Sequence, residues 1–126
     1  MIKVAHRGNF EGRNPSQENS ISYIKKALDR GFHVEVDVWE KSGRYLLGHD
    51  KPQYDVKGTF LQNKKLICHA KNIEAFYSML KDKKIHCFWH EQDLCTLTSR
   101  GWVWMYPEVY IDGVLAGICS DRLSDE

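Results

Sequence analysis

The chain has 126 residues, of which 42% are hydrophobic and 12% aromatic, and its 18 basic and 17 acidic side chains leave a net charge of +1. This length fits one domain spanning residues 1–126, and the apolar fraction is ample for a packed core. The near-neutral charge excludes a general electrostatic attraction to nucleic acid or to an anionic membrane. Any anion must therefore be bound by a local arrangement of residues.

Strand-like sequence begins at Ile2, and no apolar run approaches the roughly 20 residues that a membrane span needs. We therefore expect a cytoplasmic protein with no secretory signal and no integral membrane contact. The cysteines are scattered and lack CxxC spacing, at positions Cys68, Cys87, Cys95 and Cys119. We interpret them as reduced, buried residues rather than as a disulfide framework.

The first quarter of the chain alternates strand-like and helical patterns. It predicts a strand over residues 2–5, a loop over 8–17, a helix over 18–30 and a strand over 33–39. The apolar face of this helix is formed by Ile21, Ile24, Ala27 and Leu28, and Gly31 ends it.

A turn at 42–43 then leads into a short strand over 45–48, which forms a hairpin arm. Residues 51–64 are polar and irregular, anchored by Phe60 and Leu61. The remaining expected elements are a strand over 66–70, a helix capped by Asn72, a strand over 85–89, a short helix over 92–99, a strand over 102–106, a loop at Asp112-Gly113 and a strand over 116–120.

This alternation predicts an α/β fold with about six parallel strands and a small hairpin arm. A complete (β/α)₈ barrel takes about 200–250 residues, so the chain predicts a reduced or incomplete TIM-barrel-like parallel sheet. Because an incomplete barrel leaves sheet edges exposed, we also expect a homo-oligomer that covers them.

The most informative pattern is the pair Glu35 and Asp37, which share one face of a predicted strand about 6.5–7 Å apart along the backbone. The opposite face carries Val34, Val36 and Val38 and must be packed. Two converging carboxylates resist ionisation unless a cation lies between them, and oxygen ligands favour Mg²⁺ or Ca²⁺. Taken alone, the pattern also fits the solvated polar face of an amphipathic strand.

Titratable residues lie at the ends of five strand-like segments: His6-Arg7, Glu35/Asp37, His49-Asp50, His69-Ala70-Lys71 and His90-Glu91. In parallel α/β folds the carboxyl ends of the strands form the active site. We therefore expect these side chains to converge.

Four short motifs resemble, in order and spacing, those of the glycerophosphodiester phosphodiesterase family: His6-Arg7-Gly8, Gln17-Glu18-Asn19-Ser20, Glu35-Val36-Asp37-Val38 and His49-Asp50. That family belongs to the phospholipase-C-like phosphodiesterases with a TIM-barrel fold. The segment 117–121 resembles the closing strand of the family, whereas the middle of the chain is only weakly similar.

The resemblance implies roles for individual residues. His6 and His49 would be the acid/base or nucleophilic pair, while Arg7, Lys71 and Asn19 would bind substrate. The metal ligands would be Glu35, Asp37, Glu18 and His69. The family usually has a glutamate where this chain has His69; losing a carboxylate should weaken Mg²⁺ or Ca²⁺ and favour Mn²⁺ or Zn²⁺. About two βα units of the family barrel are also missing from this length.

We therefore interpret the chain as an enzyme for metal-dependent hydrolysis, or transfer, of a small phosphodiester, glycerol- or lipid-derived. A catalytically inactive module that binds phosphate and metal is the alternative, and a structural subunit with relic motifs is a third. Trp102, Trp104 and Tyr106 alternate on one face and fit either core packing or a ligand platform. The attacking group is left open between His6 and water.

Overall fold

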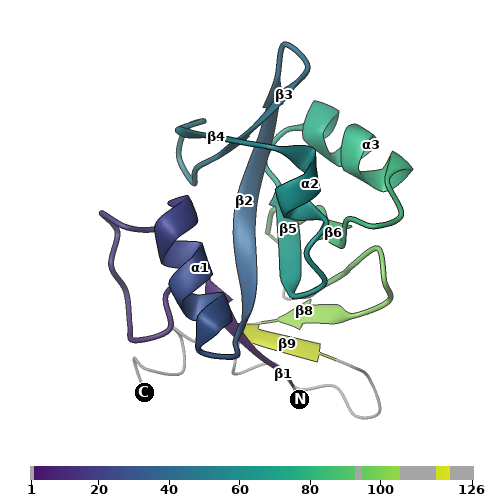
Figure 1. Ribbon diagram of the computed structural model, residues 1–126. Coiled ribbons are helices and arrows are strands. Elements are labelled where there is room, and N and C mark those ends of the chain that lie inside the picture. Colours follow the sequence, from purple (N-terminus) through teal and green to yellow (C-terminus); the bar gives the residue numbers. More distant parts are fainter. Residues whose placement is uncertain (1, 93–94, 106–115, 120–126) are drawn as a thin grey trace.

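The computed structural model describes residues 2–92, 95–105 and 116–119 (Figure 1). Within these ranges the elements in chain order are β1 (Ile2–His6), α1 (Ile21–Asp29), β2 (His33–Lys41), β3 (Arg44–Leu47), β4 (Tyr54–Val56), α2 (Gly58–Leu61), β5 (Leu66–Ala70), α3 (Ile73–Lys81), β6 (Cys87–Phe88), β7 (Cys95–Leu97), β8 (Val103–Met105) and β9 (Ala116–Cys119).

The strand β2 organises the sheet. Its first half pairs in parallel with β1 on one edge, and β5 pairs in parallel along the other edge. Its second half extends beyond β1 and pairs antiparallel with β3, which continues into β4. Parallel pairing extends the sheet from β5 to β6 and from β1 through β9 to β8, and β7 closes a hairpin with β8. The sheet is therefore mixed.

The expected α/β fold, a reduced or incomplete TIM-barrel-like parallel sheet, is wrong. The described part of the chain is rich in strands, its helices are few, and α2 has only four residues. The amide of Ser99 donates to the carbonyl oxygen of Cys87 at 2.7 Å, which joins β6 to the turn after β7. No strand pairing closes a barrel among these residues. The physical reason is that the second half of the chain forms short strands and a hairpin where βα repeats were expected.

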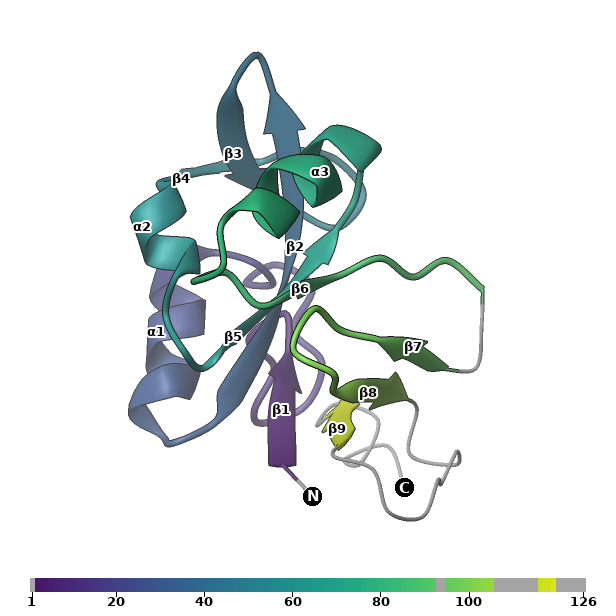
Figure 2. The ribbon, with the colours of Figure 1, turned by 90° about the vertical axis from the view of Figure 1, so that its right-hand side faces the viewer.

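The two faces of the sheet bury different residues. On one face Val34, Val36 and Val38 pack against residues of the helices, including Ile24 of α1 and Met79 of α3. In Figure 2, α1 and α2 lie on one side of β2, and β7, β8 and β9 lie on the other. The second face carries a smaller cluster formed by Val4, Ile67, Phe88 and Trp104. The candidate site lies on this second face.

Polar side chains begin the two longer helices. Ser20 Oγ accepts a hydrogen bond from the amide of Tyr23 at 3.3 Å, and Asn72 Oδ1 accepts one from the amide of Ala75 at 3.0 Å. These bonds satisfy amides that have no partner within the helix. The expected cap at Asn72 is confirmed, whereas α1 begins after Ser20 and not at Glu18.

Several local expectations are corrected. The helix expected over 92–99 is wrong, since residues 95–97 form β7 and Gly101, with a φ of +77°, turns the chain into β8. The segment 51–64 is less irregular than expected and contains β4 and α2. The strand expected over 85–89 is reduced to β6. The loop at 112–113, Tyr106 and Ser120 lie outside the described residues.

Two further expectations concern single residues and membranes. Cys68 and Cys87 are buried and free, as expected. The helices of the described ranges are all too short or too polar to cross a membrane.

Candidate active site

Strand register brings the titratable residues together. His6 of β1 is the parallel partner of Glu35 in β2, and Asp37 of β2 is the parallel partner of His69 in β5. Residues paired in this way lie side by side on the same face of a sheet. The Glu35 residue is 1% exposed and Asp37 is fully buried. The acidic side chains therefore point into the molecule, away from the helices.

The imidazole of His69 lies between the two carboxylates. Its Nδ1 is 3.5 Å from Glu35 Oε2 and 3.3 Å from Asp37 Oδ1. Its Nε2 is 3.0 Å from the carbonyl oxygen of His90, so Nε2 carries a hydrogen and donates. The ring also stacks on Phe88, with centroids 4.7 Å apart. Because Nδ1 faces two acids, a positive charge is needed between them, either a proton on Nδ1 or a metal ion.

The pKa of His69 reports the same electrostatics. Burial alone would lower it, but contacts with Asp37 and Glu35 raise it to about 9. Burial would likewise raise the pKa of the Asp37 carboxyl, but His49, His69 and Arg7 hold it well below its usual range. In the metal-free protein at neutral pH, Asp37 is therefore ionised and His69 is protonated.

The same three residues fit a divalent cation. One ligand atom from each of Glu35, Asp37 and His69 can be chosen so that all lie within 4.8 Å of one another. Glu35 Oε1 and Asp37 Oδ1 are buried and have no hydrogen-bond partner in the described structure. Such unpaired oxygens are costly unless a cation or a proton reaches them. The donor set, two carboxylates and one imidazole, suits Mn²⁺ or Zn²⁺ better than an all-oxygen site would.

Arg7 is held by contacts from three sides. Its Nη1 donates to Glu18 Oε1 at 3.1 Å, its Nε lies 3.2 Å from Asp37 Oδ2, and its Nη2 donates to His49 Nε2 at 3.2 Å. Burial would lower the pKa of Arg7, but Glu35, Asp37 and Glu18 raise it above the ordinary value. The guanidinium is therefore a permanent positive charge inside the site.

Asn19 fixes the position of Asp37. Its Nδ2 donates to Asp37 Oδ2 at 2.9 Å, and its Oδ1 accepts from the Asp37 backbone amide at 2.9 Å. Asn19 is fully buried and has a φ of +66°, a left-handed conformation that asparagine tolerates better than most residues. Asn19 therefore acts on the site through Asp37.

Both candidate catalytic histidines lie beside a carboxylate. His49 Nδ1 is 3.4 Å from Asp37 Oδ2, and His6 Nε2 is 3.8 Å from Glu35 Oε1. The loop that carries His49 is tied to β2 twice, since the amide of Gly48 donates to the Asp37 carbonyl at 3.1 Å and Trp39 Nε1 donates to the Gly48 carbonyl at 2.6 Å. Since a guanidinium can only donate, His49 Nε2 is the acceptor of the Arg7 contact and Nδ1 is the ring atom that faces Asp37.

A cavity of about 300 Å³ joins these groups. We call it the His6 cavity. Its lining comes from β1, β2, β5, β8 and the loops after β3 and β6: His6, Arg7, Glu35, His49, His69, Ala70, Lys71, Trp89, His90, Glu91 and Trp104. The candidate catalytic histidines His6 and His49 therefore face the same cavity as Arg7 and Lys71. Glu35 and His69 also line it, and together with Asp37 they form what we call the acidic cluster.

The expected site residues do not all occupy the expected positions. Seven of them line the His6 cavity or belong to the acidic cluster, namely His6, Arg7, Glu35, Asp37, His49, His69 and Lys71. Glu18 does not join the acidic cluster, because its two oxygens accept hydrogen bonds from Arg7 and from Asn9 Nδ2. Glu18 bonds Arg7 and Asn19 bonds Asp37, and their contacts with metal or substrate stay predictions.

Asn9 was missed at the sequence level, and the role of Trp104 was left open between core packing and a ligand platform. Asn9 is fully buried, holds Glu18, and accepts hydrogen bonds from the amide of Asn14 and from Tyr23 Oη. Its position three residues after His6 carries no recognisable signal. Trp104 is 6% exposed, packs on Phe88 and also lines the His6 cavity, so it belongs to the core and to the cavity wall. The alternation of Trp102 and Trp104 was the available signal.

A larger cavity, about 960 Å³, lies between α1, the β3–β4 arm and α2. None of the expected site residues lines it. Size alone therefore does not identify the chemically equipped cavity in this protein.

Comparisons of the chain with models of protein families, with curated proteins and with solved structures found no match.

Proposed function

We propose that the protein is a metal-dependent phosphodiesterase that hydrolyses, or transfers, a small phosphodiester. One observation carries the proposal: His6, His49, Arg7 and Lys71 line the same cavity as two members of the buried carboxylate–imidazole cluster, Glu35 and His69. A phosphodiester is anionic and repels nucleophiles, so its reaction needs cations and positioned proton carriers. The motif resemblance to glycerophosphodiester phosphodiesterases agrees with this chemistry and makes glycerol- or lipid-derived esters the first substrates to test.

Glu35, Asp37 and His69 would hold the divalent ion. A bound divalent cation neutralises charge on a phosphoryl oxygen and lowers the pKa of water. Mg²⁺ and Ca²⁺ are favoured by the carboxylates, and Mn²⁺ or Zn²⁺ by the imidazole. Because a ligand imidazole must be neutral, His69 would lose its Nδ1 proton when the ion binds.

The remaining residues divide the work of binding and proton transfer. Arg7 and Lys71 bind phosphate oxygens. His49 is oriented through Nδ1 by Asp37 and offers Nε2 as the proton acceptor once substrate displaces the Arg7 contact. His6 protonates the departing alkoxide, or attacks phosphorus itself, in which case water completes the reaction.

A binding module without turnover is the second candidate. The contacts that Arg7 makes with Glu18, Asp37 and His49 occupy much of its guanidinium, and His69 replaces a carboxylate. A guanidinium already bonded in this way is less able to stabilise charge that develops in a reaction, and an imidazole in place of a carboxylate weakens Mg²⁺ or Ca²⁺, so both features would lower turnover.

The test is release of p-nitrophenol from bis(p-nitrophenyl) phosphate in the presence of Mg²⁺, Ca²⁺ or Mn²⁺. His6→Ala and His49→Ala should each lower the rate by about 10²–10⁴-fold, the usual contribution of general acid–base catalysis. His33→Gln, at the other end of β2, is the control and should keep the rate. If the wild-type protein is inactive with every ion and His6→Ala changes nothing, the enzymatic proposal is wrong. Calorimetric binding of glycerol 3-phosphate without turnover would then support the module.

We further propose that the protein forms a homo-oligomer and is located in the cytoplasm. Assembly into a homo-oligomer is tested by light scattering at the concentration of the assay. A cytoplasmic location is tested by tagging the full-length protein in its host.

A further inference from the structure

A second cavity, about 480 Å³ in volume, shares Arg7 and His49 with the His6 cavity. We call it the Arg13 cavity. Its other lining residues come from the loop after β1 and the loop after β3: Arg13, Pro15, Glu18, Asn19, Asp50, Lys51 and Gln53. Since Arg7 Nη2 and His49 Nε2 are 3.2 Å apart, this pair forms a common wall between the two cavities.

The Arg13 cavity is cationic. Arg13 and Lys51 are exposed and make no ion pair with a carboxylate in the described part of the chain. Of the two acids in the lining, Glu18 is already bonded by Arg7 and Asn9. The side chain of Asp50 is 94% exposed, with Oδ1 3.7 Å from His49 Nε2. The lining therefore carries three cations, Arg7, Arg13 and Lys51, against two carboxylates, which leaves an excess of positive charge next to the proposed reaction centre.

The two cavities also differ in their apolar surface. The His6 cavity has Trp89 and Trp104 in its wall, whereas no aromatic residue lines the Arg13 cavity. Aromatic faces suit sugar or apolar groups, and unpaired cations suit anions. The substituents on the two sides of a bound phosphodiester would therefore meet different chemistry.

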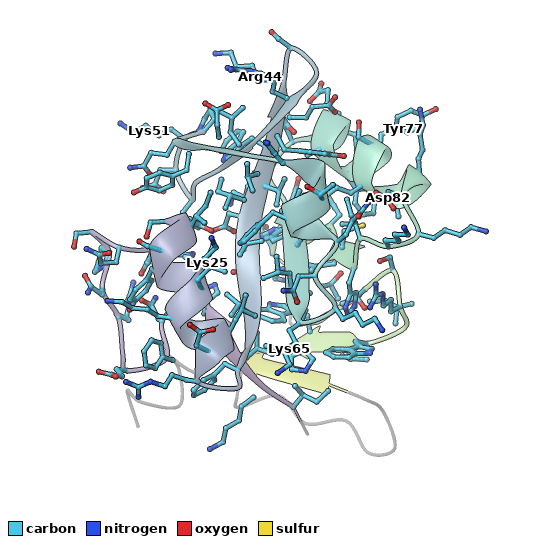
Figure 3. All side chains as sticks on the ribbon, viewed as in Figure 1. Lys25, Arg44, Lys51, Lys65, Tyr77 and Asp82 are labelled. Atoms are coloured by element: carbon cyan, nitrogen blue, oxygen red, sulfur yellow. The ribbon has the colours of Figure 1, made fainter. Side chains whose placement is uncertain are left out.

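We propose that the Arg13 cavity binds a second anionic group, so that the preferred substrate is a phosphodiester in which one alcohol carries a further phosphate or carboxylate. This inference rests on the proposed function. The phosphodiester lies at the Arg7–His49 wall, and the charged alcohol extends toward Arg13 and Lys51. Lys51 lines the Arg13 cavity, and Figure 3 shows it at the side of the molecule, pointing outward.

The experiment compares two probes that differ only in the second charge: propyl phosphate and propane-1,3-diol bisphosphate. Their dissociation constants are measured by calorimetry in the presence of MgCl₂. Two exposed cation contacts should make the bisphosphate bind about tenfold more tightly. The double variant Arg13→Gln/Lys51→Gln should reduce this ratio to about twofold or less.

The control removes the same two charges elsewhere. Lys64→Gln/Lys65→Gln changes two exposed residues before β5 that line neither cavity, and Lys65 lies well away from Lys51 in Figure 3. This variant should keep the tenfold ratio. Equal affinity of the wild-type protein for both probes, or an unchanged ratio in Arg13→Gln/Lys51→Gln, overturns the inference and leaves phosphate binding intact. Failure of both probes to bind also overturns the inference, while the proposed function is decided separately by the bis(p-nitrophenyl) phosphate assay.

Discussion

Asn19 and Asp37 exchange two hydrogen bonds, each 2.9 Å long, one from side chain to side chain and one from the Asp37 amide to Asn19 Oδ1. The pair joins the loop after β1 to the middle of β2. The side chain of Asn19, a residue with left-handed backbone conformation, therefore takes the place of a neighbouring strand here. It accepts from the Asp37 backbone N–H and also donates to a carboxylate oxygen of Asp37.

Asn19→Ala should destabilise the fold strongly, because it removes the side-chain acceptor of the buried Asp37 amide and a hydrogen bond to Asp37 Oδ2. We expect a loss of about 2–4 kcal/mol in the free energy of unfolding, measured by urea denaturation. Asn63→Ala is the control: Asn63 Oδ1 also accepts a backbone amide, from Lys65 at 2.9 Å, but in an exposed position. A loss there of more than about 1 kcal/mol, or an equal loss in both variants, would contradict the role assigned to burial.

Metal binding should depend on Glu35. A divalent ion at about 100 times its dissociation constant stabilises the folded state by about 2.7 kcal/mol, which thermal unfolding detects as a raised midpoint. Glu35→Gln should abolish most of this shift because it removes a charged ligand. Glu11→Gln changes a side chain that is 70% exposed, outside the site, and should keep the shift. An equal shift in both variants would mean that the ions bind elsewhere.

Stability should fall in mild acid because of His86, which is 1% exposed. Burial lowers its pKa to about 4, and Arg100 and His33 add repulsion. In the unfolded chain His86 takes up a proton near pH 6.5, whereas in the folded protein it does so only near pH 4. The stability that neutral His86 contributes is therefore complete above pH 6.5 and is lost as the pH falls toward 4. The loss should reach up to about 3 kcal/mol, measured by urea denaturation at each pH.

The matched variant is His86→Gln. In the wild-type protein His86 Nε2 lies 2.6 Å from Thr98 Oγ1. Glutamine can keep a hydrogen bond to Thr98 but cannot take up a proton in this pH range. Its stability should change less between pH 6.5 and 4 than that of the wild-type protein. Parallel pH profiles would assign the acid sensitivity to other groups.

Gly48→Ala should impair the site more than the fold. A Cβ at Gly48, where φ is +157°, would overlap the carbonyl oxygen of Lys51, so the loop that carries His49 must move. We expect a fall of about tenfold or more in the rate of phosphodiester hydrolysis, since misplacement by about 1 Å of a catalytic group is that costly. Gly43→Ala is the control, with a φ of +76° and no atom near its Cβ. It should cost about 1 kcal/mol in stability and leave the rate unchanged.

Alternation along β2 was the part of the site that sequence could predict. Valine at 34, 36 and 38 and acid at 35 and 37 assign the two faces of the strand directly, and the structure buries both faces as expected. The start of α1 was misplaced because Asn19 has a positive φ and Glu18 turns back to Arg7. Neither feature has a local signature.

Long-range pairing explains the other errors. The contact of Arg7 with His49 spans 42 positions, and the position of Asn9 depends on a loop whose path no periodicity records. Residues 92–99 contain polar and apolar residues at spacings that suit either a helix or a hairpin, and the turn at Gly101 decides in favour of β7. The barrel expectation failed for the same reason, since it assumed helices where the chain pairs strands.

Because Glu35 and Asp37 lie on β2, the central strand of the sheet, the proposed metal ligands should be among the last residues to be exposed on unfolding. Val34, Glu35 and Val38 have paired neighbours on both edges, so their amides should exchange hydrogen slowly, through openings that approach global unfolding. Fraying of the outer strands would leave this segment protected. Heat or denaturant should therefore separate Glu35 from its neighbours on β1 and β5 only in the transition in which the whole domain melts.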